Sequence, residues 1–489
     1  MMRAIIYNNN KELNAVRRAF EAIHRRPKSL AKLKEIMKLL NIKNIKNNKG
    51  IVANVVAAFG IKGLGMIVNM LSMPLYIDYF NDNMVLGLWF TILTVVNWIL
   101  SFDVGIGNGL RKHLTKSLAE KDYEEGKRLT SSAFVSLGIV TIAFSIIIFV
   151  LLPFVNWNDM FNISSDIVSS SVLSRCVGIT LIGIMISFFL HIVRGILFAL
   201  QLSSVVNLLH LLTSILLVAY LYIAPEFGSI EEKLNAIAIA YAILINIPSI
   251  LTLGYVFFLS EMKQCRPRIS YVTSGAMKAV LGLGITFFVV QVMYMIITVT
   301  NEWFISKFFS PEYCVDYQIY FRLFSLVGSL IMLAMSPLWS AITKAYAQKR
   351  YQWIIKLQKL LNYLALACVA LECIFVIFLQ PIMNLWLGSR AITVNYLTAS
   401  YFLLYGVIMI WVAIQSTIVA GLGTLKTQLQ FYIFAALFKI VFILVVAHIT
   451  DDWSMVILAT ALGLLPYCVY QPFEVNRILK RLNLNNNCV

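Results

Sequence analysis

The chain has 489 residues, of which 60% are hydrophobic, and a net charge of +17. Soluble proteins average about 45–50% apolar residues, and the excess here occurs in runs of roughly 20 residues, so the composition predicts a polytopic membrane protein. The longest polar stretch is the N-terminal fifty residues, which leaves no room for a separate catalytic module. The positive charge lies in short connections between apolar runs, and this placement argues against a nucleic-acid partner.

Residues 1–50 are predicted to form a basic cytoplasmic arm. Leu13, Val16, Phe20 and Ile23 recur at helical spacing, and a similar pattern follows Pro27. The arm could therefore form two short amphipathic helices on an anionic membrane surface, or it could be solvated. The sequence also leaves open whether translation starts at Met1 or at Met37.

Twelve apolar segments follow the arm, and we expect each of them to be a transmembrane helix. They lie at about 51–77, 84–104, 131–154, 172–198, 203–224, 235–259, 279–300, 317–338, 361–386, 396–420, 428–449 and 453–472. The fold expected is all-α, with two six-helix lobes around a central cavity, as in many transporters. The predicted division is an N-terminal lobe at 51–260, a cytoplasmic linker at 261–278, a C-terminal lobe at 279–472 and a cytoplasmic tail at 473–489.

The charges of the connections predict the orientation. Lys and Arg gather in the loops after the second, sixth and eighth segments and in the tail, whereas the alternate loops are mainly acidic. Because basic loops stay in the cytoplasm, both termini are expected there.

Several charged residues lie inside the apolar segments, where a charge costs about 2.5–3.5 kcal/mol on insertion scales. The cations are Lys62, Arg194, Arg322 and Lys439, and the acids are Asp103 and Glu372, with Glu302 at the outer end of the seventh segment. A cavity lined by the four cations would suit an anionic substrate such as a pyrophosphate, which Arg can bind through two hydrogen bonds. Arg194 and Arg322 could instead extend to the membrane surface. The three acids are candidates for ion coupling, and Glu372 could equally be a structural ion-pair partner.

Other site types find little support in the sequence. Gly105, Gly107 and Gly109 follow a membrane segment rather than a strand, so they do not predict a nucleotide loop. Glycines at 60, 63 and 65 would allow close helix contact or bending beside Lys62. The seven cysteines form no CxxC pair, and we predict no metal, no cofactor and no catalytic residue.

Three stretches resemble the O-antigen export family of polysaccharide-repeat flippases, within the multidrug/oligosaccharidyl-lipid/polysaccharide exporter superfamily. They are GLWFTILTVVNWILSFDVGIGNGLRKHL with the following YEEGKRLTSSAFVSL (87–114 and 123–137), FISKFFSPEYCVDYQIYFRLFSLVGSLIMLAMSPLWSAITKAYAQKRYQWI (304–354) and NLWLG (384–388). The resemblance implies a twelve-helix, two-lobe fold that opens alternately to either side. The family commonly has an Asp where Glu302 stands.

The resemblance also implies a function, namely transfer of an undecaprenyl-pyrophosphate-linked oligosaccharide from the cytoplasmic to the periplasmic leaflet of a bacterial inner membrane. The expected partners are the lipid-linked oligosaccharide, the bilayer and other membrane proteins of polysaccharide assembly. Two alternatives remain. A multidrug antiporter would need acids in its cavity to hold organic cations, and a membrane glycan polymerase or ligase would need a large external loop with catalytic residues.

Overall fold

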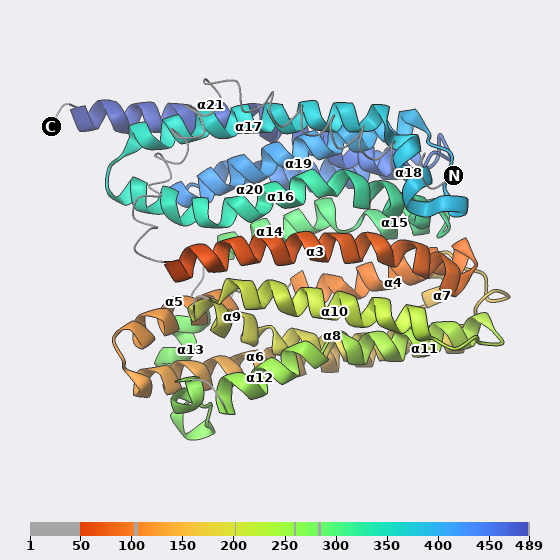
Figure 1. Ribbon diagram of the computed structural model, residues 1–489, viewed down its shortest axis with the longest axis horizontal. Coiled ribbons are helices and arrows are strands. Elements are labelled where there is room, and N and C mark those ends of the chain that lie inside the picture. The colour runs from red at the N-terminus through yellow and green to blue at the C-terminus, as the bar shows by residue number, and fades with distance from the viewer. Residues whose placement is uncertain (1–48, 102–105, 201, 259–260, 282–284, 488–489) are drawn as a thin grey trace, which may run out of the picture. The chain divides into compact units, whose positions relative to one another are not determined.

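The computed structural model describes residues 49–101, 106–200, 202–258, 261–281 and 285–487, and in these ranges it contains helices and no strand (Figure 1). The predicted arm and Asp103 lie outside the described residues. The α-helices are α3 (Lys49–Phe80), α4 (Asn83–Ser101), α5 (Ile106–Ala119), α6 (Tyr123–Leu151), α7 (Trp157–Phe161), α8 (Ser170–Leu190), α9 (Ile192–Ala199), α10 (Ser203–Ile223), α11 (Ile230–Leu244), α12 (Ile247–Phe258), α13 (Ser274–Leu281), α14 (Ile285–Thr298), α15 (Asn301–Phe308), α16 (Tyr313–Ala347), α17 (Tyr351–Ile377), α18 (Leu379–Leu387), α19 (Tyr396–Leu422), α20 (Lys426–Val446) and α21 (Met455–Asn487). Short 3₁₀ helices are η2 (Leu152–Phe154), η3 (Glu261–Cys265), η4 (Ile269–Tyr271) and η5 (Gly388–Arg390).

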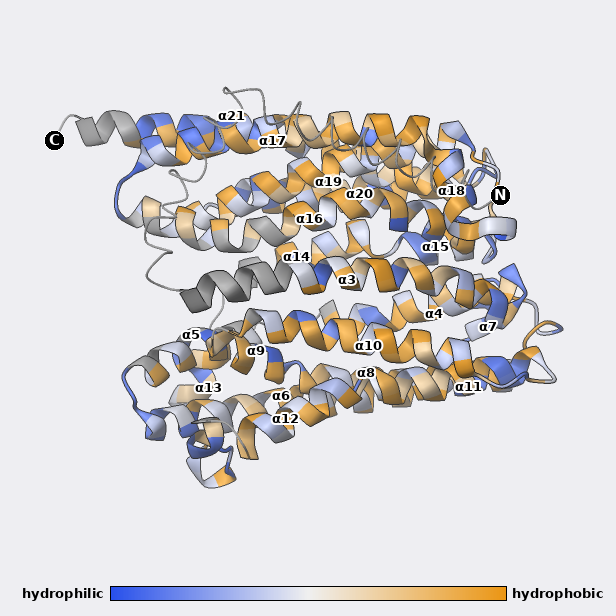
Figure 2. Cartoon of the chain, in the orientation of Figure 1, coloured by the Kyte–Doolittle hydropathy of each residue, from blue (hydrophilic) through white to orange (hydrophobic). Residues whose placement is uncertain are grey.

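The prediction of an all-α polytopic membrane protein is confirmed. Ten spans among the described residues are long and apolar enough to cross a membrane, or eleven if the bent pair α14 and α15 is one broken span. The 35-residue α16, which is not among them, covers the segment predicted at 317–338. In Figure 2 the apolar colours follow the helices and the hydrophilic colours gather at their ends.

Short polar side chains set where several helices begin. Asp122 accepts a hydrogen bond from the backbone N–H of Glu125 at the start of α6, and Ser229 accepts one from Glu232 at the start of α11. Asn395 does the same for Leu397 and Thr398 at the start of α19, satisfying backbone donors that a helix leaves free. These caps fix where α6, α11 and α19 begin.

Residues Ala57–Val489 form one compact unit. Within it, α5, α6 and α8–α13 pack among themselves, and α14–α17 and α19–α21 do likewise. We call these the first and second helix groups. Helix α4 packs on α8 of the first group and on α14, α15 and α16 of the second. Helix α13, which includes the end of the predicted linker, packs on α5 and α6. The predicted lobe boundaries themselves stay a prediction.

Three clusters of buried side chains fill the interior. The shared core joins both groups near the α3–α4 end, where Phe80 and Asn83 lie, and includes Trp89, Leu173, Tyr320 and Phe402. The other two clusters each belong to one group and lie toward the opposite helix ends, around Leu110 and Ile196 or around Ile342 and Ile418. The two groups are therefore packed together at the α3–α4 end and have separate cores at the other.

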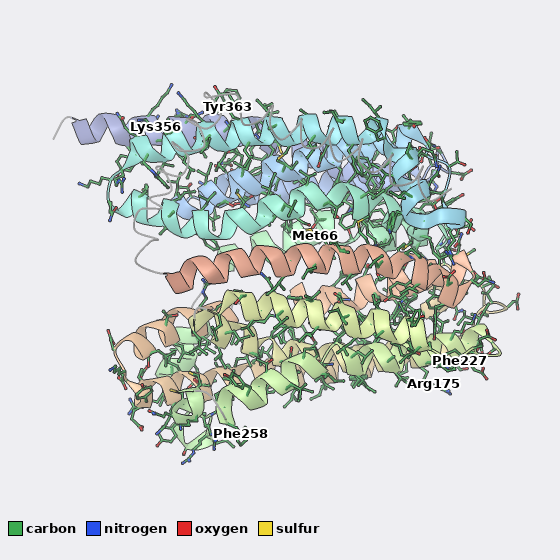
Figure 3. The ribbon with its side chains drawn as sticks, in the orientation of Figure 1. Met66, Arg175, Phe227, Phe258, Lys356 and Tyr363 are labelled. Atoms are coloured by element: carbon green, nitrogen blue, oxygen red, sulfur yellow. The ribbon has the colours of Figure 1, made fainter. Side chains whose placement is uncertain are left out.

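Large apolar side chains on the outside of the groups are exposed, as the bilayer requires. Phe258 and Tyr363, both labelled in Figure 3, are each 66% exposed. In water such a surface would be costly, but in a bilayer lipid tails cover it.

Glycines at 107, 109 and 195 hold helices close together. A Cβ at Gly109 would lie 2.0 Å from the backbone oxygen of Val280 in α13, and one at Gly195 would lie 2.8 Å from the oxygen of Gly107. These two contacts give the glycine run of α5 a packing role. Gly60, Gly63 and Gly65 have no atom within 4 Å of such a Cβ, so the close helix contact expected at these three glycines is absent among the described residues.

We predict that Gly109→Ala lowers the free energy of unfolding by about 1–3 kcal/mol, because α5 or α13 must move to admit the methyl group. The thermal midpoint of the purified protein measures the loss. Gly63→Ala is the matched control, a helical glycine with open space around it, and is expected to be neutral or slightly stabilising. Equal midpoints for the two variants would contradict the packing role.

Candidate functional site

Several buried polar side chains gather at the break between α14 and α15. The two helices meet at an angle of 45°. Lys439 of α20 is 0% exposed, and its ammonium donates to Asn301 Oδ1 at 2.6 Å, Ile297 O at 2.8 Å, Thr300 Oγ1 at 2.9 Å and Ile296 O at 3.3 Å. Lys439 therefore bonds to both sides of the break.

A second buried network continues from Glu302 on α15. Gln318 of α16 donates from Nε2 to Glu302 Oε1, and Arg322 donates from Nε to Gln318 Oε1 at 3.5 Å. Arg322 is 8% exposed and also donates to the backbone oxygen of Asn69 and to Ser72 Oγ at 2.9 Å. Glu302 and Arg322 are thus tied through Gln318 to α3.

Further polar contacts join η5, α15 and α18 to α3 and α7 near the same end. Arg390 pairs with Asp78, and Lys307 lies 3.0 Å from Asp159. The indole N–H of Trp386 donates to Met70 O at 2.9 Å. The α3–α4 end is therefore closed by polar contacts as well as by the shared core.

Lys62 and Arg194 form a separate group with two histidines. Both cations act electrostatically on His210 of α10, and Arg194 also acts on His191 between α8 and α9. Lys62 and His210 are exposed, and Arg194 is partly buried. Among the described residues Lys62 has no hydrogen-bond or ion-pair partner. Figure 3 labels Met66, one helical turn from Lys62 on α3.

The four predicted cations therefore lie in three different settings. Lys62 and Arg194 both act electrostatically on His210, whereas Arg322 and Lys439 lie in separate buried networks. Their expected role in substrate binding stays a prediction, and Asp103 lies outside the described residues.

Glu372 of α17 is 1% exposed, and neither of its carboxyl oxygens has a hydrogen-bond partner in the described structure. Its carboxyl lies against Gly406 of α19, where a Cβ would be 2.7 Å from Glu372 Oε2. Burying an unpaired charge costs far more than burying a neutral group, so this environment favours the protonated acid. A structural ion pair for Glu372, one of the two roles considered from the sequence, is absent in the described residues.

Sequence reasoning missed several residues of these networks, namely His210, Thr300, Asn301, Gln318 and Thr460. Asn301 lies directly after the predicted span 279–300, and Gln318 lies one turn before Arg322. A polar residue one helical turn from an intramembrane charge is a usable signal. The helix break at residues 299–300 contains no glycine or proline, so the sequence did not predict it.

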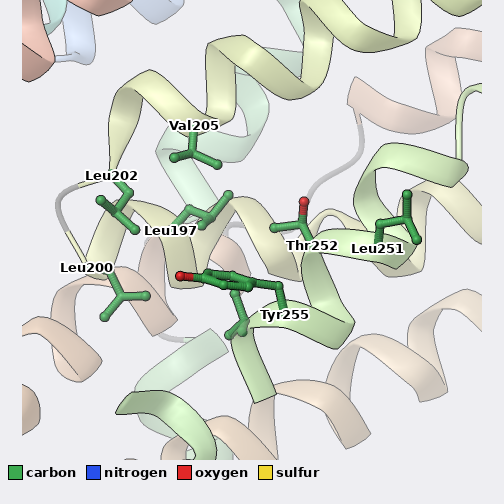
Figure 4. Close-up of a pocket in the computed structure, with 8 residues that line it drawn as sticks. Leu197, Leu200, Leu202, Val205, Leu251, Thr252 and Tyr255 are labelled. Atoms are coloured by element: carbon green, nitrogen blue, oxygen red, sulfur yellow. The ribbon is translucent and has the colours of Figure 1, made fainter. Parts of the chain in front are cut away.

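An apolar pocket of about 430 Å³ lies elsewhere, between α9, α10 and α12 (Figure 4). Its lining includes Leu197, Leu200, Val205 and Leu251, with hydroxyls from Thr252 and Tyr255. Leu251 and Tyr255 are 69% and 57% exposed, so the pocket opens to the surface that faces lipid.

No protein-family model and no curated protein matches this chain. Solved structures do match it. An inward-facing multidrug resistance MATE family transporter of the MOP superfamily aligns with TM-score 0.62 and 15% identity, over 87% of this chain and 95% of that one. The chain has the fold of MATE transporters.

Two further MATE-fold neighbours agree. A MATE in complex with MaL6 aligns with TM-score 0.60 and 15% identity, over 88% of this chain and 96% of that one. A MOP superfamily transporter from Pyrococcus furiosus, in which reverse polarity of the binding pocket suggests a different function, aligns with TM-score 0.60 and 16% identity over the same shares. The first and third of these neighbours are described as transporters.

Proposed function

We propose that this protein is a flippase that moves an undecaprenyl-pyrophosphate-linked oligosaccharide from the cytoplasmic to the periplasmic leaflet of a bacterial inner membrane. The observation that carries the proposal is that Lys62, an exposed cation, and Arg194 both lie on helices of membrane-spanning length and both act electrostatically on His210. Two positive charges at one place suit a pyrophosphate, because Arg binds it with oriented hydrogen bonds and Lys meets it as a point charge.

The position of this cationic group supports alternating access. Lys62 lies in the N-terminal half of α3, away from the closed α3–α4 end. In the predicted orientation that half is nearest the cytoplasm, where the pyrophosphate would enter. The glycan would follow between the helix groups while the lipid tail stays in the bilayer. Arg322 and Lys439 already have several protein acceptors, whereas Lys62 is exposed, so we assign the phosphate first to Lys62.

A multidrug antiporter is the second candidate, favoured by the MATE-fold neighbours and by the buried acids Glu302 and Glu372. A deletion strain distinguishes the two. Lipid-linked oligosaccharide accumulating on the cytoplasmic leaflet, with loss of surface polysaccharide, would support the flippase. An unchanged lipid-linked pool with altered drug sensitivity would support the antiporter and exclude the flippase.

For either candidate we propose that a buried acid, Glu302 or Glu372, couples transport to an ion, and Glu372 gives the simpler test. Glu372→Gln is expected to keep the thermal midpoint within about 2 °C of the wild type, because an uncharged amide replaces an unpartnered carboxyl. Transfer in proteoliposomes should lose its response to a pH gradient. Glu226→Gln, at an exposed loop acid, is the control and should keep the response. An unchanged response in Glu372→Gln would remove Glu372 from coupling.

A further inference from the structure

The surroundings of Lys439 are unusual for a buried lysine. Its ammonium contacts oxygens of the α14–α15 break and no carboxylate in the described structure. Two of these oxygens belong to the backbone of Ile296 and Ile297 in the last turn of α14, where carbonyl groups lack helical partners. The helix dipole places partial negative charge at the same point. The face of the Phe304 ring also contacts the ammonium, with the ring centroid 5.3 Å from Lys439 Nζ.

Each of the four oxygens can only accept a hydrogen bond from Lys439. Ile296 and Ile297 contribute carbonyl oxygens, and Asn301 contributes its amide oxygen, which also accepts from Thr460 Oγ1 at 3.1 Å. The Thr300 hydroxyl donates its hydrogen to Ile296 O at 2.6 Å, so Thr300 Oγ1 faces Lys439 Nζ as an acceptor. A neutral lysine amine has only two hydrogens to donate, and its lone pair would face one of these acceptors without forming a hydrogen bond. An ammonium has three hydrogens to donate and no lone pair. The arrangement therefore fits the charged form.

Oxygens of this kind at a helix break are what membrane transporters use to coordinate a sodium ion or a proton. We propose that these oxygens form a monovalent-cation site whose resident cation is the Lys439 ammonium, carried on the chain itself. The side chain supplies the positive charge that stabilises the break, so this site needs no sodium in the native protein. This inference does not depend on the identity of the transported substrate.

The main test replaces Lys439 with alanine, which empties the site and leaves the oxygens in place. Lys439→Ala is expected to lower the thermal midpoint in choline chloride, and sodium or lithium chloride at equal ionic strength should recover about 2 °C or more by binding the folded state. The wild type should show no difference between these salts. Lys439→Met is the matched control, because its apolar side chain fills the space and leaves no room for an ion, so it should be destabilised without recovery.

Two results of this test would overturn the proposal. One is a folded Lys439→Ala whose midpoint is the same in sodium, lithium and choline. The other is a Lys439→Ala that cannot be purified in sodium although Lys439→Met can.

Asn301→Asp tests the charge of Lys439 without removing it. A carboxylate beside an ammonium is paired, so the midpoint should stay within about 2 °C of the wild type. Beside a neutral amine the new acid would have no charged partner and could be buried only after taking up a proton, which costs stability. A loss as large as that of Lys439→Met would overturn the proposal, even if Lys439→Ala does not fold.

Discussion

Replacing Lys62 with alanine is expected to lower the transfer of lipid-linked oligosaccharide about 10–100-fold, while the amount of protein in the membrane is unchanged. Lys62 is exposed and has no partner among the described residues, so its removal breaks no packing. The expected loss is that of one charge-assisted hydrogen bond to phosphate, about 1.5–3 kcal/mol. Surface polysaccharide and the rate of transfer in proteoliposomes measure the effect.

The controls for Lys62 separate charge at the site from charge in general. Lys356→Ala removes an exposed lysine of α17, labelled in Figure 3, and should leave transfer unchanged. Lys62→Arg keeps the charge and should retain most of the rate. Normal surface polysaccharide in Lys62→Ala would remove Lys62 from the substrate site.

Replacing Arg322 with alanine is expected to cost about 3–5 kcal/mol of stability, because breaking a buried charged network leaves its other members unpaired. Glu302 would lose the cation that Gln318 links to it, and the backbone oxygen of Asn69 would lose its donor. Arg322→Lys should recover only part of the loss, since an ammonium does not reproduce the planar set of donors. The thermal midpoints of the purified wild type, Arg322→Ala and Arg322→Lys measure these differences in stability.

Arg175→Ala is the control for Arg322, since Arg175 is an exposed arginine at the start of α8. Its free energy of unfolding should lie within about 0.5 kcal/mol of the wild-type value. Because Arg322 joins α16 to α3, its loss should also loosen the α3–α4 end. Two cysteines, one replacing Lys62 and one replacing an exposed residue of the second group, should then form a disulfide faster than in the protein that keeps Arg322. A midpoint for Arg322→Ala equal to that of Arg175→Ala would show that the network contributes little.

Hydropathy by itself determined the fold class and most of the helix positions. In a bilayer every backbone polar group must be satisfied within the chain, so a long apolar segment has little choice but to be a helix. The boundaries of α19 and α20, for example, follow the predicted segments 396–420 and 428–449 closely. The same reasoning identified Lys62, Arg322, Lys439, Glu302 and Glu372 as residues that need a physical explanation, because charges within apolar segments are costly.

Only the tertiary structure decided which groups surround each of those charges, because pairing depends on the rotation and depth of helices far apart in sequence. Arg322 and Asn69 are 253 residues apart, and Lys439 and Asn301 are 138 apart. Lys439 was expected beside Lys62 in one cavity, yet its ammonium lies in the break between α14 and α15, which no glycine or proline marks. Hydropathy reports how deep a residue lies in the membrane, whereas contacts across the bundle decide whether it faces substrate, an ion site or another helix.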